Sequence, residues 1–469
     1  MIHTVSCDTL HIFFHHVANI RHIRVWTGLL ERPLITERDK LNCDQVAHQQ
    51  MAATAMISGE NKLSPNWFRF SIAASALLGL AVSNHVSAET ISASSCSSSA
   101  VQNALSSAKP GDTVAVPAGN CSWGSFSVPG GVHLRGAGIG STRVTINGTV
   151  TINKHSTVSV ELSGFSFSKS GGDNAAKMFR VLGSWNHEPP LIHDNEFTVN
   201  SAAIFLYETN GGVIYQNVFR GGLDDSAIQH KINNDNQSWS SADTMGTRDT
   251  NGKMNLYVED NLFEGMANQA TDFDDAARVV FRYNTLRHSS FNSHGLATSP
   301  IGVRHYEIYN NHFAYPNENV NQSWHIWLRG GTGVIFDNDI DDINGSQWGN
   351  KRELLLSVRA AVDGGVTGCC RSWACKHQVG QNHDGTRQYL DPLRMWNNKG
   401  TLSHGLNDGW GKSCGQDMDS YLQNGRDFVF ASSPKSGYSP YTYPHPLRNG
   451  GNQAPPKQPR APSNLTPDQ

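Results

Sequence analysis

A short phrase recurs along the middle of this chain: an apolar, often aromatic run is followed by Asn, any residue, and then Phe, Leu or Ile. The Asn residues of its copies are Asn195, Asn217, Asn261, Asn284, Asn311 and Asn338. Successive copies are 22, 44, 23, 27 and 27 residues apart, and the long step equals about two short steps or one step with an inserted loop. Such a period indicates stacked repeats, because each unit is too small to bury its own apolar face.

The length of the period selects the kind of repeat. A propeller blade takes about 40–45 residues, and an antiparallel meander needs a hairpin signal at every step. Steps of 22–27 residues, each with two or three short strands, fit the coils of an all-β parallel β-helix. In that fold each Asn can stack on the Asn of the next coil and bond the backbone at the bend. We therefore expect these Asn residues to be structural rather than catalytic.

The composition argues against a nucleic-acid partner. The 469 residues carry a net charge of −3 without a basic block, and only 16% of them are charged, whereas phosphate recognition needs a basic patch. Gly is abundant, at 44 residues, and Asn, Ser and Thr are frequent. This composition suits short strands joined by tight turns and a surface that binds sugars.

The first 88 residues do not resemble mature structure. Residues 51–88 read as a signal peptide, with Lys62 and Arg69 at a basic start, an apolar stretch over 70–82 and a small-residue cleavage site at the end. The apolar stretch is too short for a membrane span, although an uncleaved anchor is the alternative. Residues 1–50 are interpreted either as an upstream extension that is not part of the native protein or as a leader of no readable purpose. We thus expect a secreted or periplasmic protein without a membrane span.

The eight cysteines fit an exported protein. Cys7 and Cys43 lie in the leader, and the remaining six are Cys96, Cys121, Cys369, Cys370, Cys375 and Cys414. An even number in an exported chain predicts disulfides. A bond between Cys96 and Cys121 would tie an N-terminal cap to the first coil, and the other four would staple the C-terminal region. A metal cluster is the alternative, but the adjacent pair at 369–370 is poor zinc-ligand spacing.

The mature chain divides into a repeat region and an irregular end. A capping helix is predicted over residues 97–108, with the β-helix spanning 89–360. The apolar face of that helix consists of Val101, Ala104, Leu105 and Ala108. Residues 361–448 lose the period and are interpreted as a disulfide-stapled cap or lid, and 449–469 as a Pro-rich tail.

Two glycine-rich stretches carry a family resemblance. Residues 110–119, Pro-Gly-Asp-Thr-Val-Ala-Val-Pro-Ala-Gly, and residues 131–141, which begin Gly-Val-His-Leu-Arg-Gly, resemble the opening coils of the pectate-lyase-like right-handed parallel β-helix superfamily. The resemblance covers about residues 95–360 and implies a right-handed coil. The superfamily includes lyases, hydrolases, esterases and non-catalytic surface proteins, so the fold alone does not decide the reaction.

Alternate residues of each strand face outward, so we looked for polar outward residues on the strand preceding each Asn-x-Phe turn. With Phe273, Ile326 and Leu328 facing inward, the neighbouring polar residues project from one flank. The predicted strip consists of Lys231, Asp272, Asp274, His294, His325, Arg329 and Arg359. The candidates for substrate binding beside it are His230, Arg304, Trp324 and Trp327.

Cations beside carboxylates and imidazoles suit β-elimination on a uronic-acid polymer. A cation must first neutralise the substrate carboxylate, so that the neighbouring C5 proton becomes acidic. Ca²⁺ held by Asp272, Asp274 and Asp275 could supply this charge, because Ca²⁺ prefers oxygen ligands. Alternatively Arg329 could hold the carboxylate with two hydrogen bonds. The superfamily resemblance implies lyases with a Lys or Arg base beside bound calcium.

The reaction also needs a base and an acid. Lys231 or His294 could remove the C5 proton, and Arg359, His325 or His294 could protonate the leaving oxygen or position its proton donor. Each residue also has a structural interpretation, such as a solvated lysine or a residue that shapes a turn. The sequence therefore predicts a polysaccharide lyase that acts as a monomer on an acidic polysaccharide.

Two other function classes stay open. Asp274 and Asp275, followed by Ser293-His-Gly295 one coil later, resemble part of the polygalacturonase pattern, which would give an inverting hydrolase. The Asn-Thr-Asp and Arg-Ile-Lys parts of that pattern are missing. A non-catalytic carbohydrate-binding surface protein is the third class.

Overall fold

A computed structural model describes most of the chain from residue 88 onward. The described residues are 88–169, 177–199, 201–232, 249, 254–294, 302–316, 322–343, 353–357, 373–375, 377–384, 386–406 and 418–449. The chain divides into two units, Met1–His85 and Val86–Gln469, and every described residue lies in the second. The predicted leader, the signal peptide up to residue 87, Arg359 and the tail from residue 450 fall outside these ranges. Within them, no helix is long and apolar enough to span a membrane.

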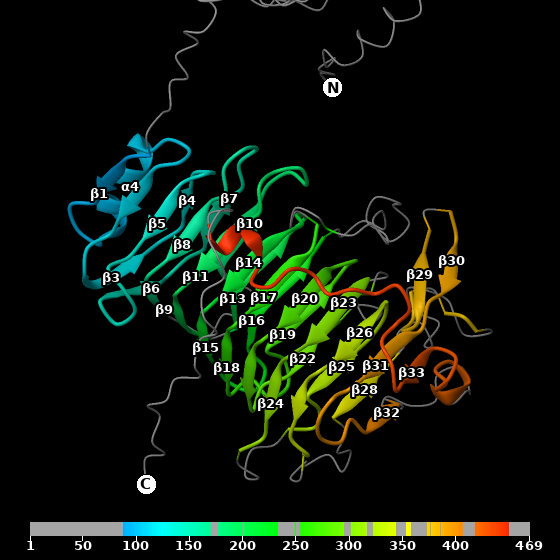
Figure 1. The fold of residues 1–469 in the computed structure, drawn as a ribbon. Coiled ribbons are helices and arrows are strands. Elements are labelled where there is room, and N and C mark those ends of the chain that lie inside the picture. Colours follow the sequence, from blue (N-terminus) through cyan, green and yellow to red (C-terminus); the bar gives the residue numbers. More distant parts are fainter. Residues whose placement is uncertain are drawn as a thin grey trace, which may run out of the picture. The chain divides into compact units, whose positions relative to one another are not determined.

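Each coil contributes strands to three parallel sheet faces (Figure 1). Sheet A comprises β1 (Thr90–Ser92), β2 (Thr113–Ala115), β5 (His133–Arg135), β8 (Glu161–Ser163), β11 (Leu191–His193), β14 (Gly212–Tyr215), β17 (Leu256–Glu259), β20 (Arg278–Arg282), β23 (His305–Tyr309), β26 (Thr332–Phe336), β31 (Leu393–Trp396) and β33 (Phe428–Phe430). Sheet B comprises β3 (Gly119–Trp123), β6 (Thr142–Ile146), β9 (Ser166–Lys169), β12 (Glu196–Thr198), β15 (Val218–Arg220), β18 (Leu262–Glu264), β21 (Thr285–Arg287), β24 (His312–Ala314) and β27 (Asp339–Ile340).

The third face is made of two sheets in sequence. Sheet C comprises β4 (Phe126–Val128), β7 (Val150–Asn153), β10 (Lys177–Leu182), β13 (Ala202–Tyr207), β16 (Ser226–Lys231) and β19 (Thr271–Asp274). Sheet D comprises β22 (Phe291–Asn292), β25 (Ile326–Leu328), β28 (Leu354–Leu356) and β32 (His404–Leu406). A parallel bridge between Phe273 and Ser293 joins the two sheets. Because the chain visits A, B and then C or D in successive coils from β2 to β28, the predicted parallel β-helix is confirmed.

The interior is filled by stacked apolar side chains. Phe167, Phe197, Phe219 and Phe263 come from four successive coils, and neighbouring ring centroids are 5.5, 4.9 and 5.1 Å apart. Each of these rings is at most 1% exposed. The Phe of the recurrent phrase is thus the inward residue of each sheet B strand, and the stack buries large apolar area coil by coil.

The recurrent Asn forms a continuous ladder at the corner between sheets A and B. The side-chain amide of each Asn donates to the Asn of the next coil over 2.9–3.2 Å, from Asn195 through to Asn398. The residue before each ladder Asn has a φ between 51° and 57°. This left-handed conformation makes the corner tight, and the Asn amide satisfies the backbone there. The structural role predicted for these Asn residues is confirmed.

The predicted N-terminal helix and disulfide are both present. Helix α4 (Ser98–Ser107) is capped by Ser97, whose side chain accepts from the Ala100 amide, and its buried face contacts β1, β2 and β3. Cys96 and Cys121 form a disulfide with a Cα–Cα distance of 5.8 Å. Cys375 is also disulfide-bonded, while residues 369, 370 and 414 lie outside the described ranges.

The β-helix continues beyond its predicted end at residue 360. Strands β31 and β33 extend sheet A, β32 extends sheet D, and the antiparallel strands β29 (Gln381–His383) and β30 (Gln388–Leu390) are inserted before them. The short helix η3 (Met418–Ser420) precedes β33. The boundary prediction failed here because the inserted hairpin separates Asn398 from the preceding ladder Asn by 60 residues, which hides the period.

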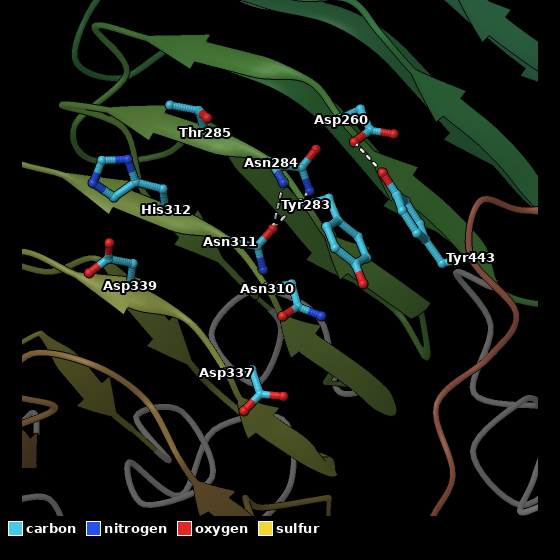
Figure 2. A pocket seen from close by; sticks show the side chains of 10 residues that line it. All are labelled: Asp260, Tyr283, Asn284, Thr285, Asn310, Asn311, His312, Asp337, Asp339 and Tyr443. Carbon is cyan, nitrogen blue, oxygen red and sulfur yellow. Dashed lines mark hydrogen bonds between the residues drawn. The ribbon is translucent and has the colours of Figure 1, made fainter. Parts of the chain in front are cut away.

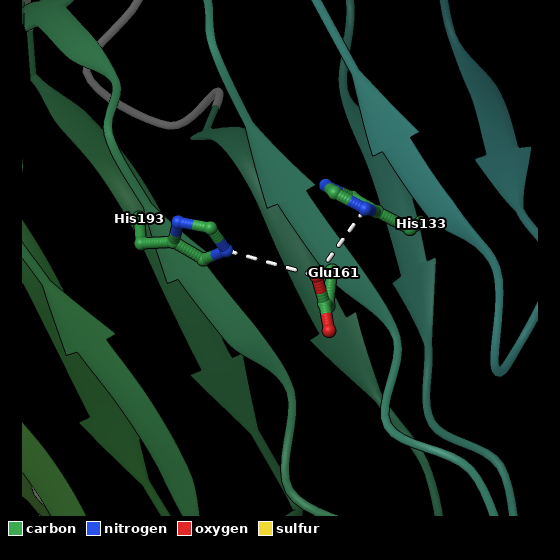
Figure 3. Close-up of side chains that lie close together, drawn as sticks. All are labelled: His133, Glu161 and His193. Carbon is green, nitrogen blue, oxygen red and sulfur yellow. Dashed lines mark ion pairs between the residues drawn. The ribbon is translucent and has the colours of Figure 1, made fainter. Parts of the chain in front are cut away.

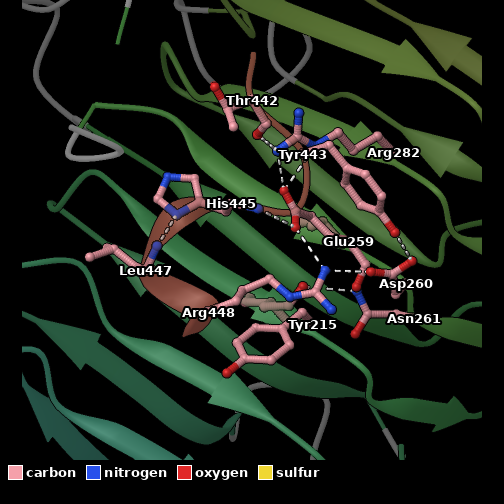
Figure 4. A network of polar contacts seen from close by, with 12 residues as sticks. Tyr215, Glu259, Asp260, Asn261, Arg282, Thr442, Tyr443, His445, Leu447 and Arg448 are labelled. Atoms are coloured by element: carbon pink, nitrogen blue, oxygen red, sulfur yellow. Dashed lines mark hydrogen bonds and ion pairs between the residues drawn. The ribbon is translucent and has the colours of Figure 1, made fainter. Parts of the chain in front are cut away.

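Residues 438–448, here called the strap, run back along the outer face of sheet A (red in Figure 1) and include part of η4 (Pro446–Asn449). The backbone oxygens of Tyr441 and Thr442 accept from Arg282 over 2.8 and 2.7 Å. Arg448 reaches Glu259 over 2.9 Å (Figure 4). The strap therefore packs on the outer face of sheet A, within the region predicted as a C-terminal cap or lid.

Candidate active site

The predicted site residues that face outward lie on sheets C and D. The strand directly before each ladder Asn belongs to sheet A, so the candidates sit one strand earlier in the coil than the sequence suggested. Lys231 of β16 pairs with Asp274 of β19. The bridge between sheets C and D extends this column to His294, and the pairing of β22 with β25 extends it to Arg329. Four ionisable residues from four coils therefore lie in one outward column.

Two hydrogen-bonded pairs form the centre of this column. The Lys231 ammonium Nζ lies 2.9 Å from Asp274 Oδ2, and His294 Nδ1 lies 2.6 Å from Asp272 Oδ1. The side chains of Lys231 and His294 are 24% and 23% exposed, whereas those of Asp272 and Asp274 are 11% and 2% exposed. The carboxylates are thus buried supports, and the nitrogen-bearing groups face solvent.

The charges in this cluster determine which group can act as a base. Burial lowers the pKa of Lys231, but Asp274 and two further nearby carboxylates outweigh it and raise this pKa above the ordinary lysine value. Lys231 therefore stays an ammonium ion, which argues against its predicted role as the base. Burial raises the pKa of Asp272, but the adjacent His294 and two lysines outweigh it and lower this pKa. Because Nδ1 is bonded to Asp272, the neutral form of His294 would carry its lone pair on Nε2.

An aromatic and cationic group continues the face on sheet D. The guanidinium carbon of Arg329 lies 3.8 Å from the centroid of the Trp327 ring, and the Trp324 ring meets Trp327 edge-on at 4.6 Å. Trp324 is partly exposed and donates to Asn292 Oδ1 over 3.0 Å. Indole rings beside a guanidinium group can stack on a sugar ring while the cation meets its carboxylate.

Sequence reasoning missed the part of this face on the preceding coils. The guanidinium carbon of Arg180 lies 4.7 Å from the ring centroid of Tyr207, whose ring is 5.2 Å from that of Phe205. In register, Phe205 pairs with Gln229 and Tyr207 with Lys231. The alternation of apolar and polar residues along β10 was a usable signal, but the search began only at residue 229.

Three predicted residues face away from any substrate, and these predictions are wrong. His230 is fully buried on the interior side of β16, and burial lowers its pKa to about 3. His325 is also fully buried, donates from Nε2 to the Asp341 carbonyl over 2.8 Å, and has a pKa lowered by burial to about 4. Arg304 is 1% exposed beside the start of β23. Neither histidine is available as an acid or a ligand contact at neutral pH.

The predicted calcium ligands do not form a cation site in the described residues. Asp274 is engaged by Lys231 and also accepts from the Asp275 amide over 2.7 Å, while Asp272 is engaged by His294. Among the residues that the structure describes, the group of three carboxylate or imidazole side chains with ligand atoms close together lies elsewhere, on sheet A. The geometry does not fit the Ca²⁺ prediction, so no step of the reaction is derived through that ion.

A polar pocket of about 320 Å³ lies along the corner between sheets A and B (Figure 2). Its lining residues are Asp260, Tyr283, Asn284, Thr285, Asn310, Asn311, His312, Asp337, Asp339 and Tyr443. The ladder Asn residues and the left-handed residues before them make up six of these ten, and the Tyr443 ring stacks on Tyr283 with centroids 3.6 Å apart. The corner geometry and the strap account for this pocket, so we take the outer face of sheets C and D as the candidate active site.

No family model and no curated protein sequence matches the chain. Among solved structures, it is similar to the A-module of the mannuronan C-5 epimerase AlgE4 from Azotobacter vinelandii, with 14% identity, a TM-score of 0.34, and coverage of 67% of this chain and 88% of that one. An alginate lyase from Paenibacillus sp. strain FPU-7 gives 16% identity, a TM-score of 0.27, and coverage of 68% and 97%. A family 28 exopolygalacturonase from Yersinia enterocolitica gives 10% identity, a TM-score of 0.24, and coverage of 68% and 77%.

Proposed function

We propose that this chain is an exported enzyme that cleaves a uronic-acid polysaccharide by β-elimination, with His294 as the base. The observation that carries the proposal is the Asp272–His294 pair beside the Lys231–Asp274 pair on one solvent-facing column. A base and a fixed cation lie within one or two residues of each other across adjacent strands. This combination matches what C5 deprotonation of a uronate requires.

The proposed reaction assigns one task to each group. Arg329 and the Lys231 ammonium neutralise the C6 carboxylate of the substrate, which acidifies the C5 proton. His294 Nε2 takes that proton while Asp272 holds the ring and stabilises the imidazolium. The C5–H electron pair becomes the C4–C5 double bond, the C4–O bond breaks, and water protonates the leaving oxygen.

The aromatic residues of the face supply substrate binding in this proposal. Trp324 and Trp327 lie at the Arg329 end of the column, and Phe205 and Tyr207 lie at its other end, on the coil before Lys231. An extended polymer that crosses several coils would stack on both groups and place one uronate between them. Binding energy from these flanking units would orient C5 at His294.

The test is a panel of uronic-acid polymers incubated with the full chain, with and without a chelator, and followed by ultraviolet absorbance. Elimination produces an unsaturated end that absorbs, and His294→Gln should abolish this signal. New reducing ends without absorbance would support hydrolysis instead. Polymer retention without products would support a binding protein.

A second readout separates elimination from a related reaction. Removal of the C5 proton followed by its return to the opposite face of the ring would epimerise the sugar without cleaving the chain. In deuterated water, epimerisation places deuterium at C5 of intact polymer, whereas elimination leaves an absorbing end. If the enzyme produced neither deuterium at C5 nor an absorbing unsaturated end, His294 would not be a base that removes the C5 proton.

A further inference from the structure

Three side chains converge on the outer face of sheet A, far along the chain from the residues of the proposed active site. His133 of β5, Glu161 of β8 and His193 of β11 come from three consecutive coils (Figure 3). Glu161 Oε2 lies 3.3 Å from His133 Nδ1 and 3.7 Å from His193 Nε2. One ligand atom from each residue lies within 4.8 Å of the other two.

These separations fit a bound transition-metal ion. A tetrahedral Zn²⁺ with ligand bonds of about 2.0–2.1 Å separates its ligand atoms by roughly 3.3–3.4 Å. The two separations from Glu161 are close to this value, and a small rotation of one imidazole would shorten the third. Two imidazoles and a carboxylate are a ligand set for Zn²⁺ and its neighbours, whereas Ca²⁺ prefers an all-oxygen set.

The hydrogen bonds on the second nitrogen of each imidazole also fit a metal-binding role. His133 faces Glu161 with Nδ1, and its Nε2 lies 2.7 Å from Ser163 Oγ. His193 faces Glu161 with Nε2, and its Nδ1 lies 2.7 Å from Asp194 Oδ2. A metal-binding histidine characteristically bonds an oxygen through its second nitrogen, which fixes the tautomer and the direction of the lone pair.

The cluster is ordered and yet open to solvent. The His193 ring stacks on Tyr215 with a centroid distance of 4.5 Å and an angle of 11°. The side chains of His133, Glu161 and His193 are 20%, 31% and 14% exposed. An ion can therefore reach preoriented ligands, and water can complete its coordination.

We infer that His133, Glu161 and His193 form a binding site for a divalent transition-metal ion, with Zn²⁺ as the ion to test. The ion would link three successive coils at the N-terminal end of sheet A. This inference is independent of the proposed elimination, because its residues lie on a different sheet from His294.

The experiment titrates the chelator-treated full chain with Zn²⁺ by calorimetry, and with Co²⁺ by visible absorption. In calorimetry, the wild type should bind one more equivalent of Zn²⁺ than His193→Ala or Glu161→Gln. In the visible spectrum, Co²⁺ should give the absorption of a low-coordinate nitrogen and oxygen site in the wild type and in neither variant. Circular dichroism checks that both variants fold, and two variants guard against the failure of one.

Two further substitutions sharpen the assignment. Asp194→Asn keeps a residue that tolerates the left-handed backbone at this position, and it should weaken Zn²⁺ binding about 10- to 100-fold without changing the stoichiometry. His312→Ala, which removes a histidine near a carboxylate on sheet B, should change nothing. An equal stoichiometry in the wild type and both folded ligand variants, or no Zn²⁺ binding by the wild type, would overturn the inference.

Discussion

The outer faces of sheet A and of sheets C and D are built by the same coils but differ in how far their side chains are buried. On sheet A the outward residues of the middle coils combine apolar and aromatic side chains, including Val213, Tyr257, Val280 and Phe336, with buried charged ones such as Glu259 and Arg282, and the strap packs against them. On sheets C and D the outward residues are charged or amphipathic, and Lys231 and His294 reach solvent. Identical backbone geometry thus yields a covered face and an open one, and the outward side chains decide which is which.

Ion pairs on the two faces differ in the same way. Arg282 and Glu259 are both fully buried on sheet A, where Tyr309 and strap carbonyls complete the guanidinium's hydrogen bonds. Lys231 is partly exposed beside Asp274 on the other face. Arg282 and Glu259 are desolvated and fully hydrogen-bonded, so they keep one arrangement. Lys231 is partly solvated, so it can exchange Asp274 for a substrate carboxylate. This comparison separates a structural face from a proposed catalytic face.

The largest expected effect comes from His294→Gln on the open face. Removal of the proposed base should lower kcat on the cleaved polymer by about 10²–10⁴-fold, while the free energy of unfolding falls by no more than about 3 kcal/mol because the buried Asp272 loses its charged partner. Steady-state kinetics and urea denaturation measure the two quantities. His312→Gln on sheet B is the matched control and should leave both unchanged. Turnover within a few-fold of the wild type would remove His294 from the mechanism.

The next effect belongs to the covered face. Glu259→Gln leaves Arg282 and Arg448 without their shared carboxylate and should lower the free energy of unfolding by about 3–5 kcal/mol. Glu264→Gln on sheet B removes a carboxylate from the half-exposed Arg220 and should cost less than about 1 kcal/mol. Urea denaturation of both variants tests the difference. Equal costs would mean that burial does not distinguish these pairs.

Acid should destabilise the covered face through His445. Burial, together with Arg282, lowers the pKa of His445 to about 4 in the folded protein, against about 6.5 when unfolded. The unfolded state therefore binds the proton more tightly, and stability falls as the pH drops from about 6.5 to 4. In His445→Gln this loss should be smaller by on the order of 2–3 kcal/mol at pH 4.

Urea denaturation at pH 7 and pH 4 measures the His445 effect. His312→Gln, whose side chain is 47% exposed, should keep the pH dependence of the wild type. A His445→Gln variant with the same loss between pH 7 and pH 4 as the wild type would show that His445 does not carry it.

The smallest expected effect concerns substrate binding at Trp327. Trp327→Phe keeps an aromatic ring under Arg329 but weakens the stacking and the cation–π contact, so KM should rise about 2- to 10-fold with kcat unchanged. Trp396→Phe is the control on sheet A, where Trp396 stacks on Phe336 with centroids 4.4 Å apart. A similar KM change in both variants would argue against a substrate role for Trp327.

The fold could be predicted from the sequence because each repeat determines both a corner and a core position. Each Asn-x-Phe phrase supplies a corner amide and an inward aromatic, and both recur with every coil. The last rung, Asn398, and the strands around it were missed because a hairpin interrupts the spacing. The strap has no period of its own, and its position depends on contacts with Glu259 and Arg282, far away in the sequence.

Residue orientation was predictable inside strands and not at their ends. Alternation placed Asp272 and Asp274 outward around Phe273, and the structure agrees. His325 precedes β25, so strand alternation does not apply to it; it is buried, and its Nε2 donates to the Asp341 carbonyl. His230 lies within β16 next to Lys231, so consistent use of alternation would have placed it inside. Hydrogen bonds such as Asp272 to His294 need the lateral register of the coils, which the sequence does not give.

The strap affects the order in which the coils of the β-helix unfold. A solenoid loses its end repeats first, since each terminal unit has only one neighbour. Here Tyr438 donates to Glu307 over 2.5 Å, and the guanidinium carbon of Arg448 lies 4.5 Å from the Tyr215 ring three strands of sheet A away. The strap, a single segment, thus links the coils that contain Tyr215 and Glu307 and the coils between these two. Unfolding from the C-terminal end requires the strap to detach from sheet A first. We therefore expect the coils that the strap contacts to unfold cooperatively and not one after another.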